Sequence, residues 1–325
     1  MTKVFGKTLI AMTLLAAAGA QAQSVETVRL GNLKFAHYGA VSYIKEIAPK
    51  CGIKVDEKIF PKGLDVMQAI IAGELDVGTT ASEAAISGRA GGAPIYVVAG
   101  FAKGGARLVA RPDLKITSVP QLKGKRVGVT RGGIQEVLLM AELAKHNMKA
   151  DPAPGKDVQL VFLPYADLNQ ALLGKQIDAM MQSEPQSSQA INKGFGVEVL
   201  KPYDTPIGEP IRTLVMTEKF YRDRRPVAQK FMRCFVEATR TFIEKPAVAE
   251  QYVREVIFKN QITSDDFQDA IRNSPYSYTI TPEHIQVTTD VMFKTGVGRM
   301  SRPPVAKDWV RTDLLEVAMK DLNIR

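Results

Sequence analysis

The sequence predicts an α/β protein made of two lobes, each a parallel β-sheet covered by helices. Three observations support this prediction: the chain has 325 residues, strand patterns alternate with helix patterns, and the same order of elements occurs twice. A single core seldom organises so long a chain, because domains typically hold ~100 to 200 residues. Strands that alternate with helices favour a parallel sheet with helices on its faces. We therefore expect two sheets with a cleft between them.

The first residues have the pattern of a secretory signal peptide. Lys3 and Lys7 form a short basic segment. Residues 8–18 are apolar and uncharged, but this run is shorter than the about 20 residues that span a bilayer. The Ala-Gln-Ala sequence ending at Ala22 has the small-x-small pattern of a cleavage site. We predict cleavage after Ala22 and localisation in the periplasm, without a lipoprotein anchor, because the first cysteine of the chain is Cys51.

Hydrophobic periodicity places the elements of both repeats. Alternation with β-branched residues indicates strands, and apolar residues at helical spacing indicate helices. In the first repeat we expect strands at residues 28–32, 54–60 and 75–79 and helices at residues 40–48, 65–72 and 84–89. In the second repeat we expect strands at residues 126–130, 158–163 and 177–182 and helices at residues 134–147 and 167–173.

One part of the repeat survives in the residues themselves. Residues 65–71 (DVMQAII) align without gaps to residues 167–173 (DLNQALL). We expect Asp65 and Asp167 to cap these helices, with the glutamine three residues later as the other half of a capping box. The match predicts a shared architecture for the two lobes.

The repeat also predicts which loops face the cleft. In open parallel sheets, ligands bind beyond the carboxyl ends of the strands, where the strand order switches. The loops that follow the first and third strands of each lobe are residues 33–39, 79–83, 131–135 and 183–185.

In the first lobe these loops carry four candidate ligand-binding residues. Thr80 and Ser82 lie in a capping-box pattern that is completed by Glu83. A helix start also presents free N–H groups that suit an anion, so ligand contact and pure capping are both open for Thr80 and Ser82. His37 and Tyr38 follow the first strand, where they either stack on or hydrogen-bond to a ligand, or lie exposed on the surface.

The second lobe carries five more candidates. Thr130, Arg131, Gly132 and Gly133 connect a strand to a long helix, and two glycines allow close backbone approach. The glycine amides and the Arg131 guanidinium are suited to an oxyanion such as a sulfonate or carboxylate. The alternative is a glycine turn with a solvated Arg131. Glu184 follows the third strand, so we expect it to face the cleft as an acceptor for an amine or hydroxyl group.

Several function classes are disfavoured by what the sequence lacks. The formal net charge is +9, but the basic residues are scattered among acids, so we expect no nucleic acid as partner. The sequence contains no Walker A, GxGxxG, HExxH or GxSxG motif. The spacing of His37, His146 and His284 does not suit a metal site. We predict a protein that is not an enzyme and has neither a cofactor nor a bound metal.

The two cysteines leave two possibilities. An oxidising compartment permits one disulfide between Cys51 and Cys234. Because Cys234 lies among apolar residues, two buried free thiols are the favoured interpretation.

Four segments resemble a known family. Residues 73–80 (GELDVGTT), 92–99 (GAPIYVVA) and 122–129 (LKGKRVGV) are similar to the nitrate, taurine and sulfonate class of ABC-transporter substrate-binding proteins (NMT1/THI5-like). Residues 220–243 are similar to the family's C-terminal helices. The likeness extends over nearly the whole chain after the signal peptide, in order and in spacing.

This resemblance implies a type II periplasmic-binding-protein fold, with two α/β lobes and a ligand cleft between them. The expected division is a signal peptide at 1–22, the first lobe at 23–105 and 212–325, and the second lobe at 106–211. It also implies a monomer that binds a small organic anion by hinge closure. The expected ligand is a sulfonate, a taurine-like compound or an aromatic carboxylate, delivered to an ABC permease with its cytoplasmic ATPase.

The same resemblance leaves alternatives open. Family members commonly carry Trp-Glu-Pro where this chain has Ser183, Glu184 and Pro185. The class also includes pyrimidine and thiamine-precursor binding proteins, and THI5-like enzymes share the fold. Those enzymes use a histidine and a cysteine-rich iron motif, whereas this chain has two isolated cysteines. A periplasmic sensor that uses the same cleft is a third interpretation.

Overall fold

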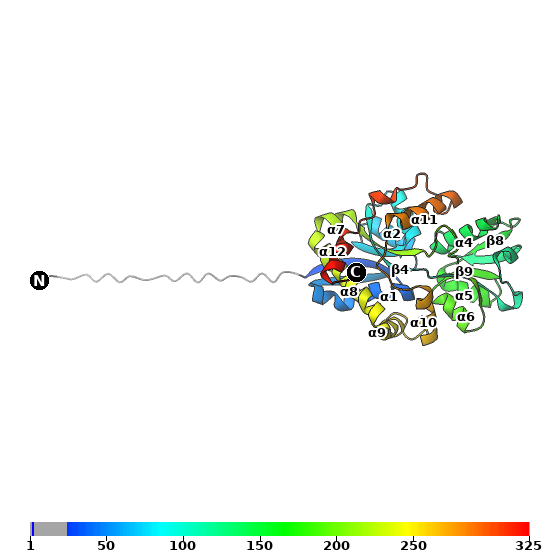
Figure 1. Ribbon diagram of the computed structural model, residues 1–325, viewed down its shortest axis with the longest axis horizontal. Coiled ribbons are helices and arrows are strands. Elements are labelled where there is room, and N and C mark those ends of the chain that lie inside the picture. The colour runs from blue at the N-terminus through cyan, green and yellow to red at the C-terminus, as the bar shows by residue number, and fades with distance from the viewer. Residues whose placement is uncertain (1, 3–24, 325) are drawn as a thin grey trace.

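The protein consists of two β-sheets, each covered by helices on both faces (Figure 1). A computed structural model describes Thr2 and residues 25–324. The predicted signal peptide, residues 1–22, lies outside the described residues except for Thr2, and so does its cleavage site. Within the described part of the chain, no helix is both long enough and apolar enough to cross a membrane.

The first sheet has the strand order β2-β1-β3-β11-β4. Its strands are β1 (Glu26–Leu33), β2 (Ile53–Phe60), β3 (Val77–Ala81), β4 (Ile95–Lys103) and β11 (Ile211–Thr217). Strands β2, β1 and β3 are parallel, and β11 runs antiparallel to β3 and β4. All five residues of β3 are buried, as expected for a central strand with helices on both sides.

The second sheet repeats this arrangement in the order β10-β5-β9-β6-β8-β7. Its strands are β5 (Ala106–Ala110), β6 (Lys125–Val129), β7 (Ala150–Asp151), β8 (Val158–Phe162), β9 (Ala179–Ser183) and β10 (Val197–Leu200). Strands β8, β6 and β9 are parallel, and β5 is antiparallel to β9. The repeat is therefore confirmed, but each sheet also contains antiparallel strands, so the expectation of a parallel sheet holds for only part of each sheet.

The chain passes between the sheets twice. It leaves the first sheet after β4 and enters the second sheet at β5, through Gly104 and Gly105. It returns from β10 to β11 through residues 201–210. We call each sheet with the helices packed on it a lobe; the exact residue boundaries of the lobes stay a prediction.

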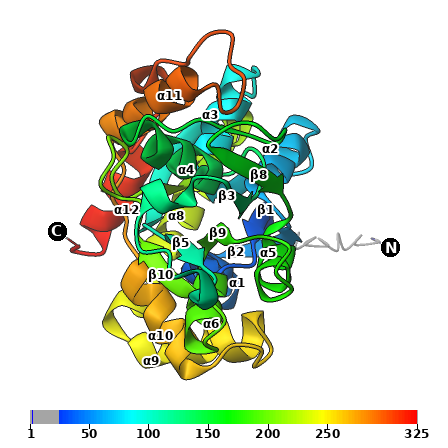
Figure 2. The same ribbon diagram turned by 90° about the vertical axis from the view of Figure 1, so that its right-hand side faces the viewer.

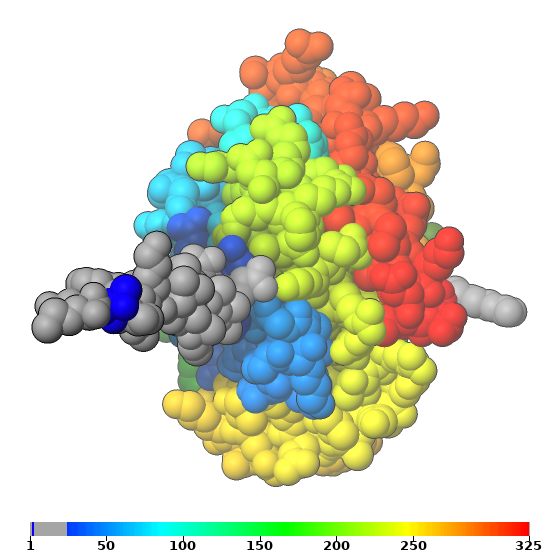
Figure 3. Space-filling view, turned by 90° about the vertical axis from the view of Figure 1, so that its left-hand side faces the viewer, coloured from blue at the N-terminus to red at the C-terminus, as the bar shows by residue number. Residues whose placement is uncertain are grey.

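Apolar faces of the helices cover the sheets. The first lobe contains α1 (Gly39–Ile47), α2 (Gly63–Ile71), α3 (Ser82–Ala90), α7 (Glu218–Asp223), α8 (Arg225–Glu244), α9 (Pro246–Gln251), α10 (Ser264–Asn273), α11 (Pro282–Thr295) and α12 (Asp313–Asp321). Figure 3 shows the outer face of this lobe, which α7, α8 and the red C-terminal residues cover. The second lobe contains α4 (Ile134–Lys145), α5 (Tyr165–Leu173) and α6 (Gln186–Asn192).

Helices from the C-terminal part of the chain contact the second lobe at two places. Helix α10 packs against α6, and α11 packs against α4 (Figure 2). These two contacts lie at opposite ends of the interface between the lobes. The lobes are therefore held together at both ends of the predicted cleft.

The predicted capping boxes are absent. Helices α2 and α5 begin two residues before Asp65 and Asp167, and neither helix has a side-chain cap. Helix α3 begins at Ser82, with Ala81 at the cap position. The aligned aspartates do occupy the same position in both helices, the third residue, where a carboxylate interacts favourably with the helix dipole. The predicted repeat is therefore confirmed. The shared aspartate is explained by the helix dipole and not by a capping box.

Cys51 and Cys234 form a disulfide, so the favoured interpretation of two free thiols was wrong. Helix α8 lies against the short helical segment at Ala48–Cys51, which brings the two Cα atoms to 6.3 Å. This separation is within the range that a disulfide spans. The apolar residues around Cys234 bury the disulfide, so an apolar environment was no sign of a free thiol.

We expect the disulfide to contribute substantially to stability. It joins residues 183 positions apart, and a crosslink over so long a loop restricts the unfolded chain strongly. Replacing both cysteines by serine should lower the free energy of unfolding by about 3 kcal/mol, measured by urea denaturation. Alkylation of two free thiols in the native protein purified from a periplasm would contradict the assignment.

Candidate functional site

A small cavity lies at the interface between the two lobes. Its volume is about 20 Å³. Each of the four loops predicted to face the cleft contributes to it, and β11 and the first residues of α2 and α5 complete the wall. The lining residues are Leu33, Phe35, His37, Tyr38, Gly63, Ala81, Glu83, Ile134, Gln135, Tyr165, Ser183 and Arg212.

Arg212 is the positive group of this cavity. It lies near the start of β11 and is 1% exposed. Its Nη2 donates to the backbone oxygens of Gly104 (2.7 Å) and Gly105 (3.2 Å), which lie where the chain crosses between the lobes. Its Nε donates to His37 Nε2 at 3.0 Å. Among the described residues, its Nη1 has no hydrogen-bond partner.

His37 is held in a single neutral form by this contact. Burial, and then the positive charge of Arg212, lowers the pKa of His37 well below its usual value. Because Nε2 accepts a hydrogen bond from Arg212, the proton of the neutral ring resides on Nδ1. Nδ1 is buried and, within the described part of the chain, lacks a partner. His37 therefore offers an N–H donor beside the Arg212 guanidinium.

Glu83 is the acidic group of the cavity. Burial raises its pKa to about 7, while the positive charge of Arg212 and the backbone amides of Glu83, Ala84 and Ile134 act in the opposite direction. Those amides belong to the first turns of α3 and α4, one helix from each lobe. The carboxyl group thus occupies the place where helix N-termini favour an anion. Its Oε2 is buried and has no partner among the described residues.

These atoms define what the cavity can bind. Arg212 Nη1 and His37 Nδ1 are donors, and each is buried and unpartnered in the described residues. Buried polar atoms without partners are uncommon, and several beside one cavity make it the candidate ligand-binding site of the described residues. Donors and a positive charge suit an oxyanion. Glu83 adds a group that accepts when ionised and donates when protonated.

Glu83 should make the stability of the protein depend on pH. Its folded-state pKa of about 7 lies above the value near 4.5 of a free glutamate, so the folded protein binds more protons between these pH values. Its contribution is therefore fully present below pH ~4.5 and is lost as the pH rises through ~7. Between pH 5 and pH 8 we expect the free energy of unfolding to fall by about 2 to 3 kcal/mol because of this group.

Urea denaturation of wild type and Glu83→Gln at both pH values measures this contribution. The variant should lose this part of the pH dependence, whereas Glu255→Gln, a change at an exposed glutamate on the outer surface, should keep it. Equal pH profiles for wild type and Glu83→Gln would show that Glu83 has an ordinary pKa.

The predicted ligand-binding residues of the first lobe divide into two groups. His37 and Tyr38 line the cavity and are buried, so the alternative of surface exposure is wrong. Thr80 is buried but does not line it, and its hydroxyl donates to the Ala81 oxygen at 3.0 Å. Ser82 is buried as well and does not line the cavity, although it opens α3 between two cavity residues, Ala81 and Glu83.

The glycine turn of the second lobe, residues 130–133, forms its hydrogen bonds with other residues of the same lobe. Gly132 N donates to Glu136 Oε2, and Gly133 N donates to Thr130 O. The Thr130 hydroxyl donates to Leu163 O at 2.8 Å. Arg131 is exposed, with its guanidinium 4.0 Å from the centre of the Phe162 ring. The residues predicted to hold an oxyanion therefore do not line the cavity. The Gly132 amide is hydrogen-bonded to the Glu136 carboxylate instead of being free for a ligand.

Gly133 has a packing role. A Cβ atom at this position would overlap the hydroxyl of Tyr165. That hydroxyl donates to Gln135 Oε1 at 2.6 Å. The glycine therefore allows Tyr165 to approach α4 and to form a wall of the cavity.

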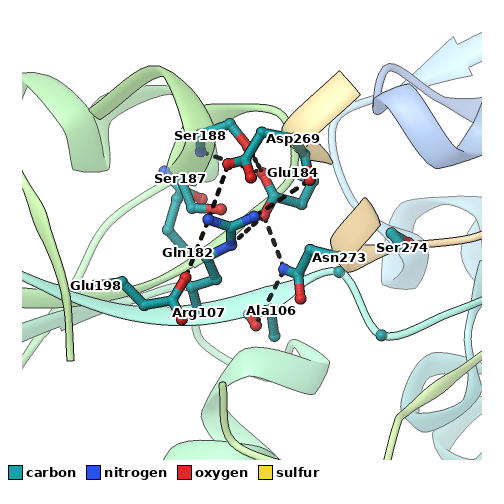
Figure 4. Close-up of polar contacts among 12 residues, drawn as sticks. Ala106, Arg107, Gln182, Glu184, Ser187, Ser188, Glu198, Asp269, Asn273 and Ser274 are labelled. Carbon is teal, nitrogen blue, oxygen red and sulfur yellow. Dashed lines mark hydrogen bonds and ion pairs between the residues drawn. The ribbon is translucent and has the colours of Figure 1, made fainter. Parts of the chain in front are cut away.

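Glu184 does not line the cavity but lies in a buried ion cluster between the lobes (Figure 4). Arg107 lies between Glu184, Glu198 and Asp269, at 2.7, 3.0 and 2.9 Å. Glu184 also accepts hydrogen bonds from Asn273 Nδ2 (2.8 Å) and from the Ser188 hydroxyl (2.7 Å). Glu184 thus lies between the lobes as expected, but protein groups from both lobes already pair with its oxygens, so its contact with a ligand stays a prediction.

Sequence reasoning missed Arg212, Glu83 as a cavity residue, and Gln135. Glu83 and Gln135 lie inside loops that were predicted to face the cleft, but a capping pattern and a helical position gave them structural interpretations. Arg212 lies on a strand that was not predicted, and the order of the strands in space brings it to the cavity. Within the described residues, no group of His, Cys, Asp and Glu is arranged to hold a metal ion.

Comparison with known proteins identifies the family. Residues 21–257, more than half of the chain, match the NMT1-like family. The chain belongs to this family. A protein of Brachyspira hyodysenteriae, named as an ABC transporter periplasmic binding protein, is 23% identical over 317 residues, 90% of each chain.

Solved structures share the fold of this NMT1-like protein. The periplasmic aliphatic sulphonate-binding protein of Escherichia coli has a TM-score of 0.74 at 18% identity, covering 90% of this chain and 99% of that chain. The periplasmic nitrate-binding protein of Synechocystis PCC 6803 has a TM-score of 0.74 at 18% identity, covering 93% and 90%. The fold is thus that of the periplasmic binding proteins, with two α/β lobes.

Proposed function

We propose that this protein is the periplasmic substrate-binding component of an ABC importer and that it binds a small organic anion between its lobes. The relatives named above are periplasmic binding proteins, and one of the solved structures binds sulfonates. A sulfonate, a taurine-like compound or an aromatic carboxylate has the charge and the acceptor atoms that the cavity requires. The ligand leaves without chemical change, and the protein is a monomer that acts with a permease and its ATPase.

One observation carries this proposal. Arg212 is a buried arginine at the lobe interface whose Nη1 has no partner among the described residues, with the His37 Nδ1 donor beside it. Leaving a buried charged donor unpaired is costly, and an anion would remove this cost. The same anion would contact residues of both lobes, because His37 and Arg212 belong to the first lobe, and Gln135 and Ser183 to the second.

Hinge closure couples binding to recognition by the permease. A ligand that contacts both lobes favours the conformation in which they are together, and the energy comes from its higher affinity for that conformation. The two crossings between the sheets, one of them at Gly104 and Gly105, are the segments where the chain can bend. Arg212 donates to both of these backbone oxygens, so the anion-binding side chain contacts the hinge directly.

A thermal-shift screen of the secreted chain tests the proposal. Organic sulfonates, aromatic carboxylates, nitrate and pyrimidines are compared at equal concentration. We expect an organic anion to raise Tm and uncharged pyrimidines to leave it unchanged, since a ligand that binds only the folded state stabilises it. Stabilisation by a pyrimidine alone would favour the alternative of a thiamine-precursor binding protein, and no response to any anion would overturn the proposal.

A further inference from the structure

A groove between the lobes adjoins the cavity. Its volume is about 580 Å³, within the range of small-molecule sites. The first lobe contributes Lys34, Phe60 and Phe258, and the second lobe contributes Lys193 and Phe195. None of the residues that line this groove is an aspartate or a glutamate.

Two aromatic rings separate the groove from the cavity. Phe35 and Tyr165 line both spaces. Phe35 follows β1 in the first lobe, and Tyr165 is the first residue of α5 in the second lobe. Their rings meet edge to face with centroids 5.4 Å apart. Because one ring belongs to each lobe, a small separation of the lobes joins the two spaces.

The volume of the cavity decides where the body of an organic anion lies. A cavity of about 20 Å³ holds one water molecule. An acidic group at Arg212 therefore brings with it a carbon skeleton that needs other space. The groove beyond Phe35 and Tyr165 has room for this carbon skeleton. Its two sides belong to different lobes, so they approach each other when the lobes close.

The chemistry of the groove indicates which skeleton fits. The rings of Phe60, Phe195 and Phe258 offer apolar surfaces for stacking. Lys34 and Lys193 are exposed, and within the described residues neither forms an ion pair. The Lys34 ammonium lies 5.3 Å from the centre of the Phe258 ring. Aromatic walls with two free cations and no carboxylate are complementary to an aromatic anion.

We propose that this groove is the subsite for an aromatic ring of the transported anion, whose acidic group binds at Arg212. This inference rests on the proposed function and narrows its substrate to aromatic carboxylates and sulfonates. The ring lies past Phe35 and Tyr165, between aromatic side chains of both lobes. Short aliphatic anions share the acidic-group site at Arg212 but leave the groove unfilled.

Calorimetric titration of the secreted chain with matched anions tests this inference. Benzenesulfonate is compared with methanesulfonate, and benzoate with acetate. Burial of the ring should make each aromatic anion at least about tenfold tighter than its aliphatic partner. Equal affinities would overturn the inference while the proposed function stands. Absence of binding by all four anions would overturn the inference, and the proposed function would fall with it only if no anion of the thermal-shift screen stabilises the protein either.

Charge reversal of the groove lysines supplies a second readout. Lys34→Glu with Lys193→Glu removes the cations beside the ring site, so it should weaken benzenesulfonate at least about threefold more than methanesulfonate, whose acidic group feels the same change in charge. The control is Lys156→Glu with Lys201→Glu, which changes the net charge equally at exposed lysines outside the groove. The control should affect both anions only slightly. The same loss of benzenesulfonate binding in both double variants would show that the groove is not the subsite.

Phe195→Ala removes one aromatic wall directly. We expect it to reduce the advantage of benzenesulfonate over methanesulfonate at least about threefold. The matched control is Phe293→Ala, because Phe293 is half-exposed on α11 and does not line the groove. An unchanged ratio in Phe195→Ala, with folding verified by circular dichroism, would contradict the assigned role of this ring.

Discussion

Replacing Arg212 by methionine should weaken binding of the organic anion about 100-fold, or about 3 kcal/mol. The change removes the positive charge and the unpartnered Nη1 donor while keeping much of the side-chain volume. Arg212→Lys should retain part of the affinity, because a lysine keeps the charge but not the planar set of donors. Calorimetric titration with the best ligand of the thermal-shift screen measures both variants.

Arg131→Ala is the matched control for this prediction. Arg131 is also an arginine near the lobe interface, but it is exposed and stacks on Phe162 outside the cavity. Its replacement should leave affinity within about twofold of wild type. Because Arg212 also contacts His37, Gly104 and Gly105, unfolding is measured in parallel. Two results would contradict the assignment of Arg212 as the anion-binding arginine. One is strong anion binding by a folded Arg212→Met variant, and the other is loss of anion binding in Arg131→Ala.

Replacing Glu184 by alanine should lower the free energy of unfolding by about 3 kcal/mol. Glu184 is fully buried, and the change removes a partner of Arg107 together with the acceptor for Asn273 and Ser188. Breaking a buried ion pair on one side leaves charge uncompensated, which is more costly than losing an exposed pair. Urea denaturation measures the effect.

Glu198→Ala is the control within the same cluster. Its side chain is 35% exposed, so water can replace its contact with Arg107, and we expect a loss of about 1 kcal/mol or less. Ligand affinity of folded Glu184→Ala should stay close to wild type, because Glu184 does not line the cavity. Lost affinity with unchanged stability would support the original expectation that Glu184 contacts the ligand.

The architecture was predictable because it depends on local patterns that the chain contains twice. Strands β1, β2, β6 and β8 and helix α4 lie within a few residues of their expected positions, since alternation and helical spacing identify them directly. The four predicted loops all contribute to one cavity. This was predictable because ligands bind beyond the carboxyl ends of the strands in open parallel sheets.

The site was predicted less completely, for a physical reason. Ligand-binding residues were sought in the loops beyond the carboxyl ends of the strands, but the structure satisfies most of the polar groups of those loops internally. The Glu136 carboxylate accepts a hydrogen bond from the Gly132 amide. The Glu83 carboxyl group interacts with backbone amides at the starts of α3 and α4. These carboxylates come from helix positions, and sequence periodicity does not show which backbone amide they reach.

The cysteines and Arg212 depend on contacts between distant segments. The disulfide forms because α8 packs beside the segment that ends at Cys51, and this packing has no local signal in the sequence. Arg212 reaches the cavity because β11 joins the first sheet after the chain has passed through the second. Such positions follow from topology, so they became visible only in the structure.

A crystal structure of the secreted chain with its tightest-binding organic anion will show whether the anion binds between the lobes. We expect its acidic group within hydrogen-bond distance of Arg212 Nη1 and His37 Nδ1, with contacts to residues of both lobes. An anion bound to one lobe alone, or held at the Gly132 turn with Arg212 unengaged, would contradict this expectation.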